Sequence, residues 1–374
     1  MDIPFADTLL SAWVRISARQ RPVAPIETLD LDNVDRVLLI LTTGLGDAIL
    51  STPIFSAVRQ ALPHARVALF VRAQWAPLFA GETDIDEVIE YRGKWRSFFR
   101  TLMRLRRFRP TLTMVLHGND PDILPLAYLS GSRHIVRIPT SGTRHGQLLS
   151  NAGRETDRNT LPTWHYIDNR LRILDTVGIP VSRRTPVIRL TETATATAAT
   201  WHQHHLGGKR YVVVHPWAAD TYKTWPTTQA SQFLTMAQAR WPDLGFVITG
   251  GRADQAAAIA LAANHHNVVV AAGTLDLPVT AALIAEANAV IAPDTGILHL
   301  ATALDTPVIG LYSPTNPALV GPRAAHAPVI ALTKPLTCDP CMEKRCPYKP
   351  ATCMGQFQAA DVLSALAPSL EGSA

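Results

Sequence analysis

Cysteine is absent from the first 337 residues of this 374-residue chain, and long apolar runs are absent throughout. No run approaches the ~20 apolar residues that a membrane-spanning helix needs, which excludes membrane-spanning proteins. The N-terminus has an acid at Asp2 and no basic segment before a long apolar core, so we expect no signal peptide. Secreted proteins of this size usually spread disulfides along the chain, so the absences together favour a cytoplasmic protein.

Acidic residues are absent from residues 92–109, which contain eight Lys or Arg. Because the whole chain has a net charge of +5, the remaining residues carry a net charge of −3. Such a basic segment is typical of a solvated helix face, and the alternative is a surface for an anionic partner such as a phosphorylated lipid or a membrane. No zinc-finger, RRM or helix-turn-helix pattern accompanies it, so we expect no nucleic acid as a partner.

Runs rich in Val, Ile and Leu alternate with segments of helical period, which predicts parallel βαβ units in two series. The predicted strands are Arg36–Leu41, Arg66–Arg72, Glu87–Tyr91, Thr111–His117 and His134–Ile138, then Arg210–His215, Gly245–Thr249, Asn267–Val270, Ala289–Ala292 and Pro307–Tyr312. The predicted helices cover 54–62, 94–108, 164–177, 226–240, 252–263, 278–288 and 296–304. At ~100–200 residues per domain, two doubly wound α/β domains are the economical interpretation.

The pattern divides the chain into four segments. A helical leader at 1–33 precedes a first domain at 34–184, a second domain at 185–355 and a C-terminal helix at 356–374. The leader has one apolar helix face, which either packs on the body or contacts a membrane surface. That face consists of Leu9, Leu10, Trp13 and Val14.

A glycine-rich turn follows the first predicted strand and contains Gly44, Gly46 and Asp47. The carboxyl end of the strands is where open α/β sheets bind ligands. A dinucleotide-binding loop would have Gly or Ala where this chain has Ile49, so the turn does not favour a nicotinamide cofactor. Asp47 either stabilises the start of a helix or presents a carboxylate for chemistry at the mouth of the sheet.

The second domain has three loops of this kind. One follows the strand at 289–292 and enters a helix, whose free N–H groups could cradle a phosphate. In the second loop, Lys223 stands before a helix that begins with a Pro and is placed to neutralise a diphosphate. In the third loop, Asp254 follows a Gly-Gly pair and could contact a ribose. Helix capping, packing and plain solvation are the alternatives. The residues concerned are Asp294, Thr295, Gly296 and His299, then Lys223, then Gly250 and Asp254.

All four cysteines lie within a short Pro-rich segment at 338–353. Four thiolates in one loop could bind zinc or iron in a tetrahedral site. Reduced thiols that only pack the loop, and disulfide bridges, are the alternatives. The residues are Cys338, Cys341, Cys346 and Cys353.

Three stretches together resemble glycosyltransferase family 9, the ADP-heptose:lipopolysaccharide heptosyltransferases and their relatives. They are VLLILTTGLGDAILSTP at 37–53, HPWAADTYKTWP at 215–226 and APDTGILHLATALDTPVIGLYSPTNP at 292–317. The likeness extends over about residues 36–365, and D-T-G-x-x-H is its strongest element.

The resemblance implies a GT-B fold, in which two Rossmann-like domains face a cleft and a C-terminal helix crosses back to the first domain. It also implies inverting, metal-independent transfer of a heptose or similar sugar to a lipopolysaccharide core precursor. The implied donor is a nucleotide diphosphate sugar, with ADP-heptose as the first candidate. By position, Asp47 matches the general base and Lys223 the diphosphate-binding lysine, and the 294–299 loop matches the nucleotide-sugar loop. Location in the cytoplasm, with or without peripheral contact with the inner membrane, follows from the same likeness.

Departures from the family pattern concern groups that could contact phosphate. Trp217 stands where Gly is common, Ala218 and Ala219 replace small hydroxylated residues, and Gly44 replaces a frequent Ser. The alternatives are a protein O-heptosyltransferase that acts on autotransporters, a sugar-nucleotide epimerase and a non-catalytic nucleotide-sugar-binding protein. Joint presence of a candidate base and a candidate diphosphate site favours a catalyst.

Helical spacing would place four arginines of the basic segment on one side, namely Arg96, Arg100, Arg104 and Arg107. We expect the apolar residues off this row to anchor the segment on a sheet; they are Phe99, Leu102 and Met103. The hypothesis is that the row, with Arg100 and Arg104 on the acceptor side, guides the acceptor or its membrane toward Asp47.

Overall fold

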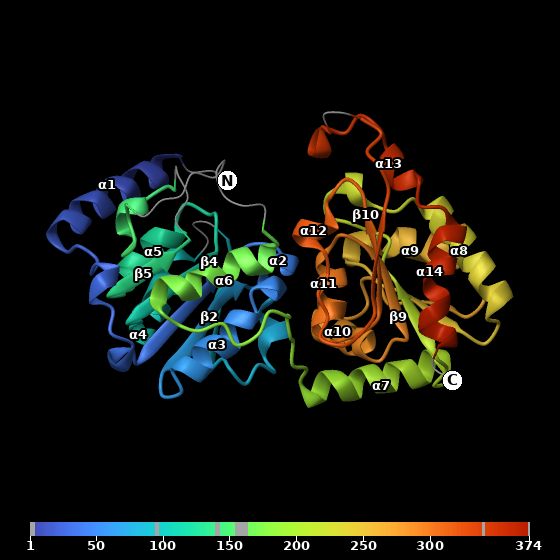
Figure 1. Ribbon diagram of the computed structural model, residues 1–374, viewed down its shortest axis with the longest axis horizontal. Helices are drawn as coiled ribbons and strands as arrows, with labels where there is room; N and C mark the ends of the chain where they lie inside the picture. Colours follow the sequence, from blue (N-terminus) through green and yellow to red (C-terminus); the bar gives the residue numbers. More distant parts are fainter. Residues whose placement is uncertain (1–3, 94–96, 139–142, 154–163, 339–340, 373–374) are drawn as a thin grey trace. The chain divides into compact units, whose positions relative to one another are not determined.

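The computed structural model describes residues 4–93, 97–138, 143–153, 164–338 and 341–372. The chain divides into two compact units, Met1–Arg184 and Thr185–Ala374. Each unit has its own parallel β-sheet covered by helices, as Figure 1 shows. Parallel sheets require helices on their faces, and this explains why the buried strands are continuous apolar runs.

The sheet of the first unit has the order β3-β2-β1-β4-β5. Every neighbouring pair is parallel, and Ile40 of the central strand pairs with Phe70 on one side and Val115 on the other. Strands are added from β1 toward β3 on one side and from β4 to β5 on the other, so the topological switch point lies beside β1, where the glycine-rich turn begins. The strands are β1 Arg36–Leu41, β2 Arg66–Arg72, β3 Glu87–Tyr91, β4 Leu112–His117 and β5 His134–Arg137.

Three helices of the first unit share one core with the sheet. Buried side chains of α1, α4 and α5 pack against Leu38, Ile40, Phe70 and Val115, while α3 and α6 contact each other on the opposite face (Figure 1). The helices are α1 Pro4–Gln20, α2 Leu45–Leu50, α3 Pro53–Ala61, α4 Phe98–Phe108, α5 Ile123–Leu129 and α6 Tyr166–Val177. Single 3-10 turns lie at Ile26–Thr28, Leu31–Asn33, Ala76–Phe79 and Gly146–Leu148.

The sheet of the second unit has the order β11-β10-β9-β6-β7-β8, again wholly parallel. Its strands are β6 Tyr211–Val214, β7 Gly245–Ile248, β8 Val268–Val270, β9 Ala289–Pro293, β10 Val308–Tyr312 and β11 Val329–Thr333. Its helices are α7 Glu192–Leu206, α8 Thr227–Arg240, α9 Gln255–Ala262, α10 Leu277–Ala285, α11 Gly296–Ala303, α12 Pro317–Val320, α13 Thr352–Gly355 and α14 Ala359–Glu371.

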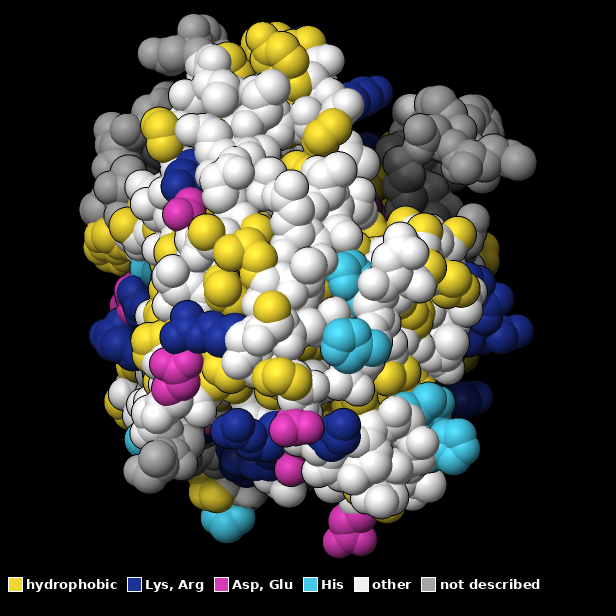
Figure 2. Space-filling view, turned by 90° about the vertical axis from the view of Figure 1, so that its right-hand side faces the viewer, with side chains coloured by type: hydrophobic (Ala, Val, Ile, Leu, Met, Phe, Trp, Pro, Cys, Tyr) yellow, Lys and Arg dark blue, Asp and Glu magenta, His cyan; other side chains and the backbone are white. Residues whose placement is uncertain are grey.

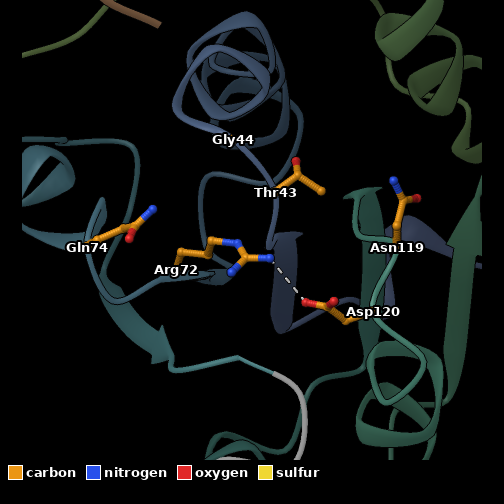
Figure 3. Close-up of a pocket in the computed structure, with 6 residues that line it drawn as sticks. All are labelled: Thr43, Gly44, Arg72, Gln74, Asn119 and Asp120. Carbon is orange, nitrogen blue, oxygen red and sulfur yellow. Dashed lines mark hydrogen bonds and ion pairs between the residues drawn. The ribbon is translucent and has the colours of Figure 1, made fainter. Parts of the chain in front are cut away.

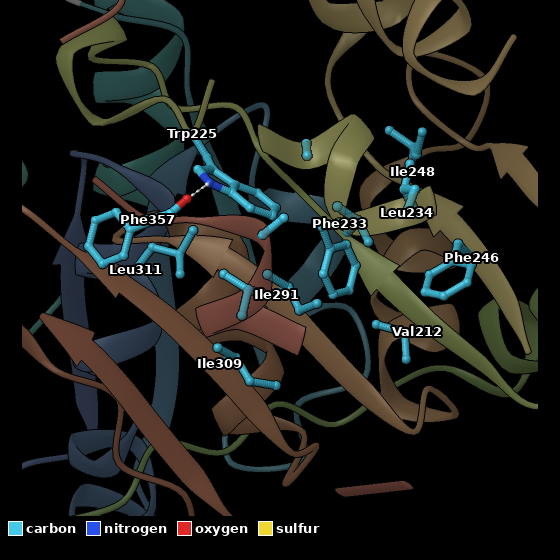
Figure 4. Packing of buried hydrophobic residues seen from close by; sticks show 14 of the residues in the cluster. Val212, Trp225, Phe233, Leu234, Phe246, Ile248, Ile291, Ile309, Leu311 and Phe357 are labelled. Atoms are coloured by element: carbon cyan, nitrogen blue, oxygen red, sulfur yellow. Dashed lines mark hydrogen bonds between the residues drawn. The ribbon is translucent and has the colours of Figure 1, made fainter. Parts of the chain in front are cut away.

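The core of the second unit is built around Trp225 and includes the C-terminal helix. Figure 4 shows the Trp225 indole directed at the Phe357 carbonyl, to which Nε1 donates over 3.0 Å. Helix α14 packs on α8 and buries Val362, Leu366 and Leu370 in this same core. The C-terminal helix therefore stabilises the second unit, and its predicted crossing to the first domain stays a prediction.

All ten predicted strands are present, each within one residue of its expected ends. Several elements were not predicted, namely helices α5, α7, α12 and α13 and strand β11. Helix α5 is buried on all sides and contains Pro125, so it has no helical period, and β11 is an edge strand with a half-exposed, alternating pattern.

The leader and the basic segment are both helical, with two corrections to the expected faces. Leu10 and Val14 pack in the core, but Trp13 is 47% exposed, and the side chain of Leu9 lies outside the described residues. In α4, Leu102 is buried as predicted, whereas Phe99 and Met103 are exposed, because Leu105 and Phe108 continue the buried side. Arg96 lies outside the described residues. Among the helices described, none has the length and apolar character to cross a membrane.

Candidate functional site

Asp47 lies in the first turn of α2, directly after the carboxyl end of β1. Gly44 is the N-cap residue and offers no side-chain cap, so the carboxylate of Asp47 contributes favourable charge at the helix start. Its Oδ1 accepts a hydrogen bond from Nη2 of Arg170, and its Oδ2 lies 3.7 Å from Nδ1 of His117. The Asp47 side chain is 29% exposed, so it remains open to a ligand while it holds this contact.

Arg170 comes from the middle of α6 and has a side chain only 6% exposed. Burial lowers the pKa of its guanidinium, and the adjacent Asp47 carboxylate opposes this by stabilising the charge. Sequence reasoning missed Arg170. The available signal was its place in the apolar row of α6, three residues after Ile167 and four before Leu174, where a cation requires a buried partner.

His117 at the end of β4 completes the surroundings of Asp47. Its Nδ1 lies 2.7 Å from the Thr43 hydroxyl, within hydrogen-bond reach. Burial lowers the pKa of His117, although Asp47 opposes the shift, so the imidazole is neutral at neutral pH. Asp47 therefore has one firm cationic partner, Arg170, and a neutral imidazole on its other side.

A cavity of about 420 Å³ opens beside this turn at the carboxyl edge of the first sheet. Figure 3 shows the ion pair in it, in which Arg72 Nη2 lies 3.3 Å from Asp120 Oδ2. Arg72 also donates to the Thr42 carbonyl and Trp75 to the Thr43 carbonyl, which fixes the glycine-rich turn in place. Five of the six lining residues have polar side chains, which could form hydrogen bonds to a hydroxyl-rich ligand; the residues are Thr43, Gly44, Arg72, Gln74, Asn119 and Asp120.

A second cavity of about 200 Å³ shares Asn119 and Asp120 with the first. Arg137 and Arg144 line it, and Arg137 donates to the Asn119 side chain over 3.2 Å. Two guanidinium groups beside a polar cavity favour a polar or anionic ligand at this edge.

The second unit brings Lys223, Asp294 and His299 together at the carboxyl end of β9. Lys223 Nζ lies 2.7 Å from Asp294 Oδ2, and His299 Nε2 lies 3.5 Å from Asp294 Oδ1. Burial alone would raise the pKa of Asp294, but His299 and Lys223 outweigh it and lower the pKa to about 2. Asp294 is therefore ionised at every physiological pH and holds the lysine ammonium at the start of α11.

Several buried polar atoms around this loop have no hydrogen-bond partner among the described residues. Buried polar groups are nearly always satisfied, so a group of orphans indicates a place for a polar ligand or ordered water. They gather at the ends of β9 and β10, where the sequence predicted a phosphate cradle at Thr295 and Gly296. The atoms are Thr295 Oγ1, His299 Nδ1, Tyr312 OH, Ser313 Oγ and Thr315 Oγ1.

Gly250 and Asp254 form the third predicted loop, after β7. A Cβ at Gly250 would lie 2.9 Å from the Trp217 indole, so the glycine permits the close packing of this unusual Trp. Trp217 in turn donates to the Thr249 carbonyl over 3.0 Å. Asp254 Oδ2 accepts from the Gly251 N–H over 2.8 Å, which is a local helix-capping role. Its contact with a ribose stays a prediction.

The four cysteines are not assembled into a ligand set. Within the described residues, no three His, Cys, Asp or Glu side chains are grouped closely enough to hold a metal ion. Cys353 is buried in the core of the second unit, and the other three thiols are partly exposed. The predicted zinc or iron site is therefore unsupported by the arrangement of the described side chains.

Each of the two parallel α/β units has polar groups at the carboxyl edge of its sheet, which is where open α/β sheets bind ligands. Residues 149–352 match the model of glycosyltransferase family 9 (heptosyltransferase), and the chain belongs to this family. It is therefore a glycosyltransferase. The chain is 27% identical over 327 residues to lipopolysaccharide heptosyltransferase 1 of Pseudomonas aeruginosa, with 84% of this chain and 88% of that protein covered.

Solved structures confirm the predicted fold class. A glycosyl transferase family 9 structure from Veillonella parvula superposes with a TM-score of 0.75 and 22% identity, covering 92% of this chain and 99% of that one. The ADP-heptose lps heptosyltransferase II of Escherichia coli superposes with a TM-score of 0.71 and 20% identity, covering 91% and 100%.

We predict that Arg170 is a positioning residue for Asp47. Arg170→Met keeps the buried volume but removes the hydrogen bond that orients the carboxylate, so kcat should fall about 10- to 100-fold while the KM for the donor stays within twofold. Arg170→Lys, which restores a cation without the planar fork, should recover part of kcat. Steady-state kinetics on both variants measures this.

Arg172→Met is the matched control, because Arg172 lies on the same helix and stacks on Trp164 rather than contacting Asp47. It should retain parental kcat. Equal losses of kcat in Arg170→Met and Arg172→Met, or no recovery with Lys, would show that α6 acts only through general stability.

Proposed function

We propose that this glycosyltransferase moves a heptose from ADP-heptose to a lipopolysaccharide core acceptor by an inverting, metal-independent displacement. The family membership carries the proposal, and it is supported by the relatives named for lipopolysaccharide heptosyl transfer and for ADP-heptose. The polar sites in both units agree with a sugar acceptor and a charged donor.

Asp47 is the general base in this proposal. A sugar hydroxyl is a weak nucleophile at neutral pH, and a carboxylate within hydrogen-bond reach takes its proton as the new glycosidic bond forms. One bond forms, between the acceptor oxygen and the anomeric carbon, and one breaks, between that carbon and the diphosphate oxygen. A single carboxylate is sufficient for such an inverting step, and the polar cavity beside Gly44 offers room for the acceptor sugar.

The second unit stabilises the leaving nucleotide diphosphate in this proposal. Negative charge grows on the diphosphate as the sugar departs, and a fixed cation plus free N–H groups stabilise it without a metal ion. Lys223 supplies the cation at the start of α11, where Asp294 orients it. The unsatisfied hydroxyls of Thr295 and Tyr312 add donors at the same sheet edge.

Asp47→Asn should reduce transfer by roughly 10²- to 10⁴-fold, because the amide cannot accept the proton. ADP binding should stay nearly unchanged, since the base acts on the acceptor hydroxyl and not on the nucleotide. Transfer of heptose to a deheptosylated core acceptor, followed by mass spectrometry, and calorimetric titration with ADP measure the two effects. If a folded Asp47→Asn protein kept the parental turnover, Asp47 would have only its role at the helix start. If the parent protein isomerised the donor without any acceptor, it would instead be an epimerase.

Lys223→Ala and Asp294→Ala should each weaken ADP binding about tenfold or more, because both remove the oriented ammonium from the predicted diphosphate site. The pair is largely buried, so loss of one partner also lowers the melting temperature. Titrations are therefore made well below that temperature.

Arg240→Ala is the control for this pair, because it breaks an exposed ion pair with Glu371 in the same unit. It should bind ADP as the parent does. Unchanged titrations in both Lys223→Ala and Asp294→Ala would exclude the phosphate cradle.

The metal prediction is tested separately from catalysis. If Cys338, Cys341, Cys346 and Cys353 bind zinc or iron, protein purified under reducing conditions without a metal-affinity tag should contain about one metal per chain. Elemental analysis measures the metal content of the parent protein and of Cys341→Ser, which should contain less metal if the cysteines bind it. A metal-free parent protein would leave the cysteines as reduced thiols that pack the loop.

A further inference from the structure

Two exposed aromatic side chains stand at the entry to α6, the helix that supplies Arg170. Trp164 is 42% exposed and Tyr166 is 46% exposed, and the buried His165 between them is the N-cap residue of the helix. Exposed apolar side chains are ordinary on a protein surface, and Figure 2 shows them interspersed with polar and charged ones. Exposure alone therefore indicates no site, and the surroundings of each ring decide its role.

The two aromatic side chains lie on different sides of α6, because each contacts a different arginine. The guanidinium of Arg170 lies over the Tyr166 ring, 5.7 Å from the ring centroid. The guanidinium of Arg172 lies over the Trp164 ring, 4.8 Å from its centroid. At 3.6 residues per turn, Arg172 points about 160° away from Arg170 around the helix. Since Arg170 contacts Asp47, Tyr166 is the aromatic group on the side of the proposed base.

Arg170 connects the Tyr166 ring directly to the Asp47 carboxylate. Its Nη2 donates to Asp47 Oδ1, while the same guanidinium lies over the ring. Tyr166 and Arg170 are four residues apart, so they share one side of the helix, and Tyr166 is about 6 Å nearer to its start. Both Tyr166 and Asp47 are partly exposed. A ligand seated at Asp47 therefore has the exposed part of the Tyr166 side chain beside it.

The predicted acceptor-side arginines of α4 do not take part in this arrangement. Arg104 Nε lies 3.3 Å from Glu87 Oε1, and Arg100 is exposed on a helix that packs on the opposite face of the sheet from α6. The described partners of Asp47 come from α6 and β4 instead. Guidance of the acceptor by the α4 arginines stays a prediction.

A sugar ring has two kinds of surface, and the residues around Asp47 match both. Its hydroxyl groups need hydrogen-bond partners, which the polar side chains of the cavity beside Gly44 provide. Its C–H groups form an apolar face with a small positive charge, and the face of an aromatic ring is apolar with a small negative charge. Ligand sites usually combine aromatic surface with a few polar groups in this way.

The same chemistry disfavours a serine side chain as the acceptor. A serine presents its hydroxyl on a single methylene group, which has no rigid face to cover an aromatic ring. The charge of Arg170 is already balanced by Asp47, so the ring and its arginine together offer no unpaired cation to an acidic peptide. A pyranose therefore uses the exposed ring more fully than a serine does.

We propose that Tyr166 is a stacking platform that packs against the C–H face of the acceptor sugar, the pyranose whose hydroxyl Asp47 deprotonates. The inference deepens the proposed function and rests on it for the identity of the acceptor as a sugar of the lipopolysaccharide core. Tyr166 determines specificity for a sugar ring over a serine side chain, and it takes no part in the chemical step.

Replacement of the ring tests the proposal by kinetics with ADP-heptose and a delipidated, deheptosylated core oligosaccharide. Tyr166→Ala should raise the KM for the oligosaccharide about tenfold, because the stacking contact is lost. The kcat and the KM for the donor should change less than about twofold, since the contact is equally strong before and during the reaction. Tyr166→Phe keeps the ring and should restore the acceptor KM, whereas Tyr166→Leu, apolar without a ring, should not.

Trp164→Ala is the matched control, because it removes an exposed aromatic side chain from the same helix entry on the side away from Asp47. It should keep the parental KM for the oligosaccharide. An equal rise of KM in Trp164→Ala, or a parental KM in Tyr166→Leu, would overturn the proposal. A fall in kcat without a rise in KM would also overturn it, because Tyr166 would then act through Arg170 and not on the acceptor.

Fluorine NMR of the full chain labelled with fluorotyrosine detects the contact without turnover. The chain contains seven tyrosines, and the signal of Tyr166 is the one missing from Tyr166→Phe. This signal should shift when the core oligosaccharide is added and should not shift with ADP or with a serine-containing peptide. No shift at oligosaccharide concentrations that saturate transfer, or a shift with the peptide instead, would overturn the proposal.

The NMR experiment also separates the platform from the proposed function. If the parent protein did not transfer heptose from ADP-heptose, the proposed function would be contradicted. A shift of the Tyr166 signal with the oligosaccharide would still support the platform in that case. Absence of both transfer and shift would overturn the two proposals together.

Discussion

A guanidinium group enclosed by the first unit requires a counter-charge, and Asp47 is the group that provides it. Arg170 is almost wholly buried, and an uncompensated charge in such a place costs several kcal/mol. The contact joins α6 to the turn after β1, two segments separated by 123 residues. The same hydrogen bond fixes the direction of the one carboxylate that the proposed reaction needs, so the stability of the turn and the geometry of the site depend on one interaction.

The second unit uses a comparable pair for a different purpose. Lys223 and Asp294 are both largely buried, and Asp294 is held ionised between the lysine and His299. Here the carboxylate is the orienting member, and the cation is the group available to a ligand. Arg170 orients an anion in the first unit, and Asp294 orients a cation in the second, which is the charge arrangement expected of a base on the acceptor side and a phosphate site on the donor side.

The parts of the fold that depend on local pattern could be predicted from the sequence, and the parts that depend on distant contacts could not. Continuous Val, Ile and Leu runs located the ten strands, and the Gly-Asp turn located Asp47. Arg170 was missed because its partner lies 123 residues away, and no local pattern indicates that pairing. The error over Phe99 and Met103 came from treating every apolar residue of α4 as an anchor, whereas Leu105 and Phe108 complete the buried side.

A general base acts only from within hydrogen-bond reach of the proton that it takes. In glycosyl transfer the transition state has oxocarbenium character, and the bond to the leaving group is largely broken before the new bond is complete. The attacking hydroxyl then becomes acidic as its oxygen bonds to carbon, and the proton transfers late. The position of the base is therefore decisive, and a carboxylate held in place by Arg170 at the edge of a cavity, as Asp47 is, satisfies that requirement.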